Sequence, residues 1–84
     1  MEPEAILLHL KKIIVTEMGL TDDEIHLDDH FLNDLGVDSL SLIDLLMLIE
    51  DEFEIEIPDT DAEGIATVRD AVDYIREHAS GKTG

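Results

Sequence analysis

The sequence predicts an all-α protein: a small four-helix bundle of three longer helices and one short one, with a long loop between the first and second helices. Three stretches carry apolar residues at helical spacing, and Gly or Pro residues separate them. The length of 84 residues allows one small domain. We expect residues 1–79 to form this domain and residues 80–84 to be a flexible tail.

The first helix is predicted over Ala5 to Met18. Pro3 and Glu4 suit a helix beginning, and Gly19 suits a helix end. The large apolar side chains of this stretch repeat along one broad face, which we expect to pack in the core: Ile6, Leu7, Leu10, Ile13, Ile14 and Met18.

The following loop runs to Asp38 and is long for a structureless connection. Thr21 to Glu24 has the form of a capping box, which predicts a single helical turn. Four apolar residues are expected to pin the rest of the loop to the helices: Leu27, Phe31, Leu32 and Leu35.

Two loop histidines, His26 and His30, stand four residues apart with Asp28 and Asp29 between them. Such residues can ligate a metal ion, but nothing else in the sequence completes a closed ligand set. We therefore expect polar loop residues here and predict no metal site.

The second helix is predicted to begin near Asp38 or Ser39 and to continue to Phe53. One side carries a core stripe of Leu42, Leu45, Leu46, Ile49 and Phe53. The other side carries a second apolar strip of Leu40, Ile43 and Met47, flanked by the acidic residues Asp44, Glu50 and Asp51. This strip is either a docking surface or part of a helix packed between others, and the flanking acids argue against full burial.

The rest of the chain contains a connector and two helices. Glu54 to Ile57 alternates like a strand, but a single strand has no partner, so we expect an extended connector ended by Pro58. Asp59 to Gly64 is predicted to be the short third helix. Thr67 is expected to cap the last helix, whose apolar face contains Val68, Ala71, Val72, Ile75 and Ala79.

The composition is strongly acidic, with 22 Asp and Glu against 5 Lys and Arg and a net charge of -17. Nucleic acid is therefore excluded as a partner, whereas basic protein surfaces would be attracted. No cysteine is present, which rules out disulfides, a cysteine nucleophile and cysteine-based zinc sites. No apolar run approaches the roughly 18 residues of a membrane span, and the N-terminus lacks signal character. We expect a cytoplasmic monomer that does not insert into membranes.

The motifs around the second helix resemble those of acyl carrier proteins. The resemblance rests on Leu35-Gly36-Val37-Asp38-Ser39-Leu40, on the helix through Met47 and Phe53, on Ile57-Pro58-Asp59, and on the stretch from Thr67 to Ile75. It covers most of the chain. The short Asp-Ser-Leu sequence alone would be weak evidence, but its register against the later motifs makes the combined signal specific.

This resemblance implies that Ser39, between Asp38 and Leu40, carries a 4′-phosphopantetheine whose thiol holds an acyl group as a thioester. It implies a phosphopantetheinyl transferase as one partner, and acyl-processing enzymes of fatty-acid or polyketide-type biosynthesis with basic docking surfaces as others. The expected docking residues are Leu40, Ile43, Asp44, Met47, Glu50 and Asp51. The expected acyl pocket is lined by Phe31, Leu45, Leu46, Ile49 and Ile65.

Three other functions are compatible with parts of the sequence. A peptidyl or aminoacyl carrier shares the architecture. The segment from Asp59 to Asp70 resembles an EF-hand calcium loop, although its fifth, eighth and twelfth positions deviate and Pro58 interrupts the incoming helix. Ser39 and His30 could be cast as nucleophile and base, but no oxyanion arrangement can be argued, so we predict that the protein is not an enzyme.

Overall fold

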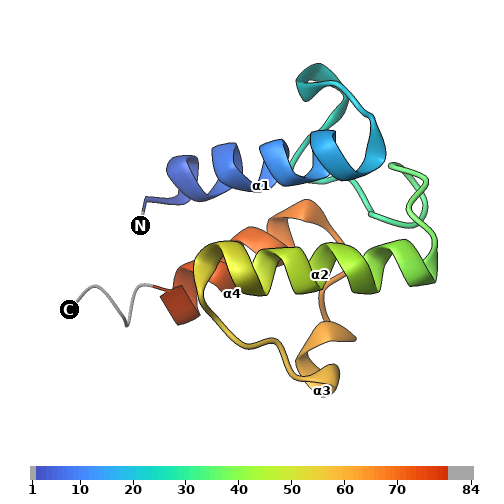
Figure 1. Ribbon diagram of the computed structural model, residues 1–84. Helices are drawn as coiled ribbons and strands as arrows, with labels where there is room; N and C mark the ends of the chain where they lie inside the picture. Colours follow the sequence, from blue (N-terminus) through green and yellow to red (C-terminus); the bar gives the residue numbers. More distant parts are fainter. Residues whose placement is uncertain (1, 80–84) are drawn as a thin grey trace.

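The computed structural model describes residues 2–79, which form four α-helices and one 3₁₀ turn. Their order is α1 (Pro3–Met18), η1 (Asp22–Glu24), α2 (Ser39–Phe53), α3 (Asp59–Ala62) and α4 (Val68–Ala79). Figure 1 shows α1 and α2 side by side, with α4 behind them and α3 below α2. No strand forms within residues 2–79, so the all-α prediction is confirmed. The predicted tail, residues 80–84, lies outside the described residues.

Helix α1 begins at Pro3, two residues before the predicted start at Ala5, and ends at Met18 as predicted, with Gly19 as its C-cap. Gly19 takes a left-handed conformation with φ of 72°, which favours glycine, and its N–H donates to the carbonyl of Val15. Three of the six predicted core residues of α1 are fully buried, and the other three are partly buried against the core. The buried three are Ile6, Leu10 and Ile14, so the periodicity identified the packed face correctly.

The long loop is held by backbone hydrogen bonds to the segment that enters α4. The N–H of Phe31 donates to the carbonyl of Ala66 at 3.0 Å, and the N–H of Arg69 donates to the carbonyl of Leu27 at 2.8 Å. The predicted turn is the 3₁₀ turn η1, where Glu24 accepts from the N–H of Thr21. The prediction that Leu32 packs against the helices is wrong. Leu32 lies in the turn after Phe31 and is exposed, so it does not hold the loop in place.

The connector after α2 forms neither helix nor strand, and its first residue, Glu54, is left-handed rather than extended. Ile55 is buried and Ile57 partly buried. Helix α3 is shorter than predicted, because it ends at Ala62 rather than Gly64. The N–H of Gly64 donates to the carbonyl of Asp61, three residues earlier, and this tight turn closes the helix.

Helix α4 is capped as predicted. The Thr67 hydroxyl accepts from the N–H of Asp70 at 3.1 Å, and the Asp70 carboxylate accepts in return from the N–H groups of Ala66 and Thr67. The buried face carries Val68, Ala71, Val72 and Ile75, whereas the side chain of Ala79 lies outside what the structure describes. None of the described helices has the length and apolar content that crossing a membrane would require.

Candidate functional site

Ser39 is the first residue of α2 and is exposed to solvent. The residue before it, Asp38, caps the helix by accepting the N–H of Ser41 at 2.8 Å. The pKa of Asp38 lies below its ordinary value, chiefly because of this backbone hydrogen bond. The Ser39 hydroxyl therefore stands at a well-defined helix start, where first-turn N–H groups and the helix dipole favour an anion such as a phosphate group.

The turn that delivers Ser39 is anchored in the core on its N-terminal side. Val37 is buried, and its N–H donates to the carbonyl of Phe31 at 2.8 Å. Gly36 has φ of 71°, a conformation that side chains disfavour, and this allows the chain to turn into α2. The loop therefore holds the exposed serine on a rigid support.

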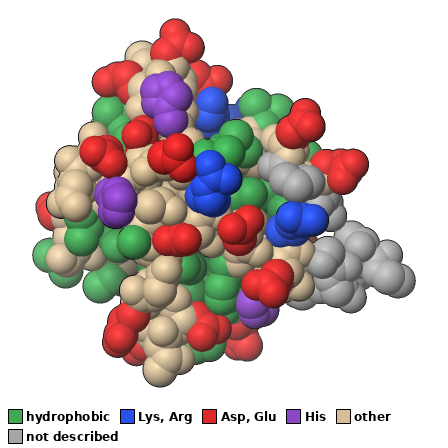
Figure 2. Space-filling view, turned by 180° about the vertical axis from the view of Figure 1, so that it is seen from behind, with side chains coloured by type: hydrophobic (Ala, Val, Ile, Leu, Met, Phe, Trp, Pro, Cys, Tyr) green, Lys and Arg blue, Asp and Glu red, His purple; other side chains and the backbone are tan. Residues whose placement is uncertain are grey.

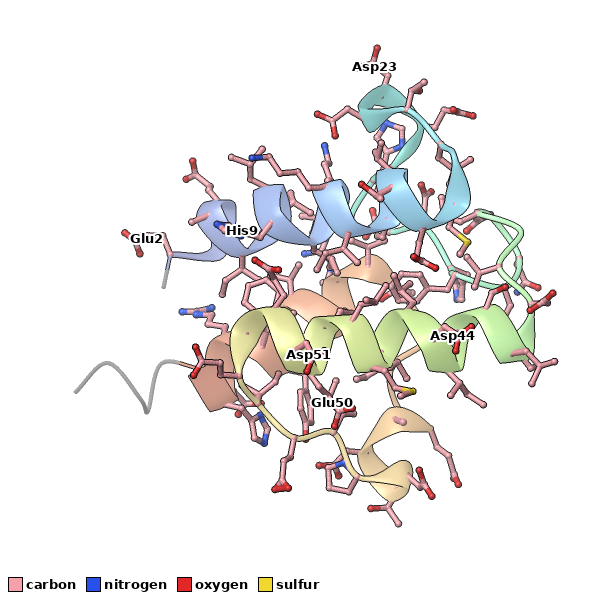
Figure 3. All side chains as sticks on the ribbon, viewed as in Figure 1. Glu2, His9, Asp23, Asp44, Glu50 and Asp51 are labelled. Carbon is pink, nitrogen blue, oxygen red and sulfur yellow. The ribbon has the colours of Figure 1, made fainter. Side chains whose placement is uncertain are left out.

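The second apolar strip of α2 is exposed. Leu40 is 76% exposed, Ile43 54% and Met47 58%, although a helix packed between two others would bury them. Asp44 and Asp51 are exposed as well, and Figure 3 shows both on the side of α2 that faces the viewer. The outer face of α2 thus combines large apolar side chains with carboxylates.

Glu50 differs from the other acids of the predicted docking surface. It is partly buried, and its carboxylate accepts the backbone N–H of Ile57 at 2.8 Å. Figure 3 shows its side chain beside the connector to α3. The Glu50 carboxylate is therefore engaged within the molecule, unlike the exposed carboxylates of Asp44 and Asp51.

The helix that forms this face carries no positive charge. The sequence has no Lys or Arg between Lys12 and Arg69, so α2 and α3 carry none. Figure 2 shows the opposite side of the molecule, where blue Lys and Arg side chains are interspersed with acidic ones. The helix that carries Ser39 therefore has acidic side chains and no basic ones.

The five side chains predicted to line an acyl pocket all lie in the closed hydrophobic core. They are Phe31, Leu45, Leu46, Ile49 and Ile65. The structure brings them into one cluster but packs them as core residues. An acyl chain could reach them only if the surrounding elements moved apart.

The calcium-loop alternative disagrees with the geometry. Asp59 and Asp61 lie within α3, the Asp61 carboxylate accepts the hydroxyl of Tyr74 at 2.7 Å, and Asp70 caps α4. Within the described part of the chain, no group of three or more His, Asp or Glu side chains is arranged to hold a metal ion. His26 and His30 each lie beside a nearby carboxylate, Asp29 at 3.5 Å and Asp34 at 3.4 Å.

Sequence reasoning missed the role of Tyr74. Its hydroxyl donates to Asp61 and also lies 3.1 Å from the carbonyl oxygen of Glu56, which fastens α3 and the connector to α4. Its ring stacks on that of His78, with the centroids 3.9 Å apart. A tyrosine between apolar positions of α4 was the available signal, but nothing in the sequence named its partners.

Comparison with known proteins agrees with this geometry. The family described as "Phosphopantetheine attachment site" matches residues 9–75, a range that includes Ser39. Proteins named acyl carrier protein from three strains of Clostridium perfringens are 51% identical to the chain over 69 residues. The matched part covers 82% of this chain and 91% of each of those proteins.

Proposed function

Because this chain belongs to the acyl carrier protein family, whose prosthetic group is 4′-phosphopantetheine, we propose that Ser39 is the residue that carries this group. The observation that supports Ser39 most is its position as the exposed first residue of α2, two residues after the buried Val37. Ser41, the other serine of α2, is partly buried. Ser39 is therefore the hydroxyl that a modifying enzyme can reach.

The residues around Ser39 fit the group. The neighbouring Leu40 projects into solvent and leaves the approach to the Ser39 hydroxyl open. The helix N-terminus favours the negative charge of a phosphodiester. When attached, the arm supplies a terminal thiol that holds an acyl group as a thioester.

The chain acts as a carrier rather than a catalyst in this proposal. It presents a tethered intermediate to successive enzymes of fatty-acid or polyketide-type biosynthesis, and the tether raises the effective concentration of the intermediate at each active site. The exposed strip of Leu40, Ile43 and Met47, with Asp44 and Asp51 beside it, docks on basic surfaces of the transferase and these enzymes. Carboxylates speed the encounter, and Met adapts to different partners.

The buried cluster of Phe31, Leu45, Leu46, Ile49 and Ile65 is proposed to shelter a short acyl chain between visits to enzymes. Leu46 and Ile65 are slightly exposed, whereas Phe31, Leu45 and Ile49 are completely buried. An acyl chain would enter beside Leu46 and Ile65. Its entry requires an open state of the bundle, and the acyl chain stabilises that state because it binds the open state better than the closed state.

The proposal is tested by loading the chain with phosphopantetheine from coenzyme A and then supplying an acyl donor with an acyl transferase. We expect an acyl adduct that hydroxylamine removes, as a thioester requires, and no adduct on the Ser39→Ala variant. An adduct on Ser39→Ala, or its persistence in hydroxylamine, would contradict the proposal. The peptidyl carrier alternative predicts instead that only an adenylating enzyme with an amino acid charges the arm.

A further inference from the structure

Leu48 is a large apolar residue of α2 that belongs neither to the core nor to the exposed strip. It is 38% exposed and follows Met47, so it lies about 100° round the helix from Met47, on the side of α1. Asp44 and Asp51 lie between the two side chains around the helix. Its exposure leaves apolar surface on the α1 side of the acidic row.

Two adjoining surface hollows meet at Leu48. One, of about 410 Å³, is lined by Met47, Leu48, Asp44, Glu50, Asp51 and, from α1, Glu17. The other, of about 500 Å³, lies between α1 and α2 and shares Glu17, Leu48 and Asp51 with the first. Ile13 adds apolar surface to the second hollow, and Lys12 and His9 also line it. The outer face of α2 is thus joined to α1 through the residues that the two hollows share.

The size of a protein interface favours a docking surface larger than the outer face of α2 alone. A specific partner covers about 800 Å² on each side. The exposed half of a 15-residue helix, about 22 Å long and 10 Å wide, offers roughly 350 Å². On the α3 side, the Glu50 carboxylate is already bonded to Ile57, whereas on the α1 side Leu48 and Glu17 are exposed.

We propose that the docking surface of this carrier continues across Leu48 to Glu17 of α1, and that the groove takes an apolar side chain of the phosphopantetheinyl transferase with a Lys or Arg beside it. The inference rests on the proposed function, because it extends the surface assigned there. The transferase is the partner chosen, since it must bring its active site to the Ser39 oxygen itself. Leu48 lies nine residues from Ser39, about 14 Å along the helix, which is within one interface.

The charges of the surface decide between possible occupants. The hollow nearer Ser39 is lined by four carboxylates and no basic residue. A second copy of this chain, with a net charge of -17, would bring a similarly acidic surface and be repelled, as would anionic lipid. A cationic protein segment is complementary to it, and its apolar residue would cover Leu48 and Ile13.

The test measures binding of the transferase to the chain and the kcat/KM of loading with coenzyme A. Leu48→Ala and Glu17→Lys are the test variants, and their melting temperatures show that they fold. Leu8→Ala removes a more exposed leucine elsewhere on α1, and Asp23→Lys makes the same kind of charge change in η1, away from α2 (Figure 3). We expect each test variant to raise Kd and lower kcat/KM about fivefold or more, and each control to stay within about twofold.

Three outcomes separate this inference from the proposed function. Losses confined to Leu48→Ala, Glu17→Lys and Met47→Ala support it. If Met47→Ala binds weakly while Leu48→Ala and Glu17→Lys bind as the wild type does, the extension to α1 is wrong and docking on α2 stands. If the wild type is never loaded at Ser39, the proposed function itself is wrong.

Discussion

The Glu50 carboxylate accepts the backbone N–H of Ile57 at 2.8 Å, seven residues further along the chain. The carbonyl of the same residue accepts the N–H groups of Glu54 and Ile55, where α2 ends in a left-handed residue. Glu50 therefore holds both ends of the connector that leads to α3. This role is structural, and it distinguishes Glu50 from Asp51 beside it.

We predict that Glu50→Ala lowers the free energy of unfolding by about 1.5 kcal/mol, because the N–H of Ile57 loses a charged acceptor in a partly buried place. Glu50→Gln should lose less, since its amide oxygen can still accept. Urea unfolding measures the difference. Asp51→Ala is the matched control and should change stability by no more than about 0.5 kcal/mol. Equal losses for Glu50→Ala and Asp51→Ala would refute the structural role.

The helices could be predicted because their signals are local. Periodic apolar residues marked the packed faces of α1, α2 and α4, and Gly19, Asp38 and Thr67 marked their ends. Helix α3 was overestimated, since in four residues the pattern is too short to locate the end. The hydrogen bonds between the long loop and residues 66–69 depend on contacts across the fold, which no local pattern contains.

The site could be predicted as far as residue types and helical faces allow. The exposed strip at Leu40, Ile43 and Met47 follows from the helix period. The sequence grouped Glu50 with Asp51 because both are acidic and adjacent. The path of the connector places the N–H of Ile57 within hydrogen-bond distance of the Glu50 carboxylate. The packing of α1 against α2 places Glu17 and Leu48 at the same hollow. Neither relationship can be seen in a local sequence pattern.

Tyr74 provides a spectroscopic test of the α3–α4 contact. Burial raises its pKa to about 12, with the hydrogen bond to Asp61 and the negative charges of Asp61 and Glu50 adding to the effect. Tyr74 is the only tyrosine, and the chain has no tryptophan, so its absorbance titration is unobscured. We expect a midpoint near pH 12 in the folded protein and a lower midpoint in Asp61→Asn, which removes the charge of Asp61 but leaves the burial of the ring.

Because the pKa of Tyr74 is raised on folding, its contribution to stability decreases at high pH. The contribution of neutral Tyr74 to folding is complete below its unfolded pKa of about 10 and is lost as pH rises toward 12. A wild-type midpoint near 10 would contradict the hydrogen bond to Asp61.

The Asp38 cap of α2 predicts that the stability of the protein falls at low pH. The pKa of Asp38 is lowered by the backbone N–H of Ser41, so its contribution is present above its ordinary pKa of 3.8 and lost as pH falls below that value. Asn also caps helices but does not titrate in this range. We expect the stability difference between wild type and Asp38→Asn to shrink between about pH 5 and pH 2. A constant difference across this range would contradict a charged cap.

Met47 tests docking on the exposed strip separately from folding. Because Met47 is mostly exposed, Met47→Ala should leave the melting temperature nearly unchanged while slowing modification by the transferase. Leu46→Ala, at a buried neighbouring position, should instead cost about 2–5 kcal/mol of stability. Quenched time courses of loading measure the rate of modification, and thermal melts measure stability. If Met47→Ala unfolds as readily as Leu46→Ala, the strip is structural.

The attachment of phosphopantetheine to Ser39 is tested most directly by mass spectrometry of the loaded chain. Cleavage after Lys and Arg leaves residues 13–69 as one piece that contains both Ser39 and Ser41, so backbone fragmentation between them must assign the added mass. We predict one added arm, present on every N-terminal fragment that ends at Leu40 or later and absent from those that end at Asp38. The mass on Ser41 instead, or no added mass after incubation with coenzyme A and an active transferase, would contradict the account.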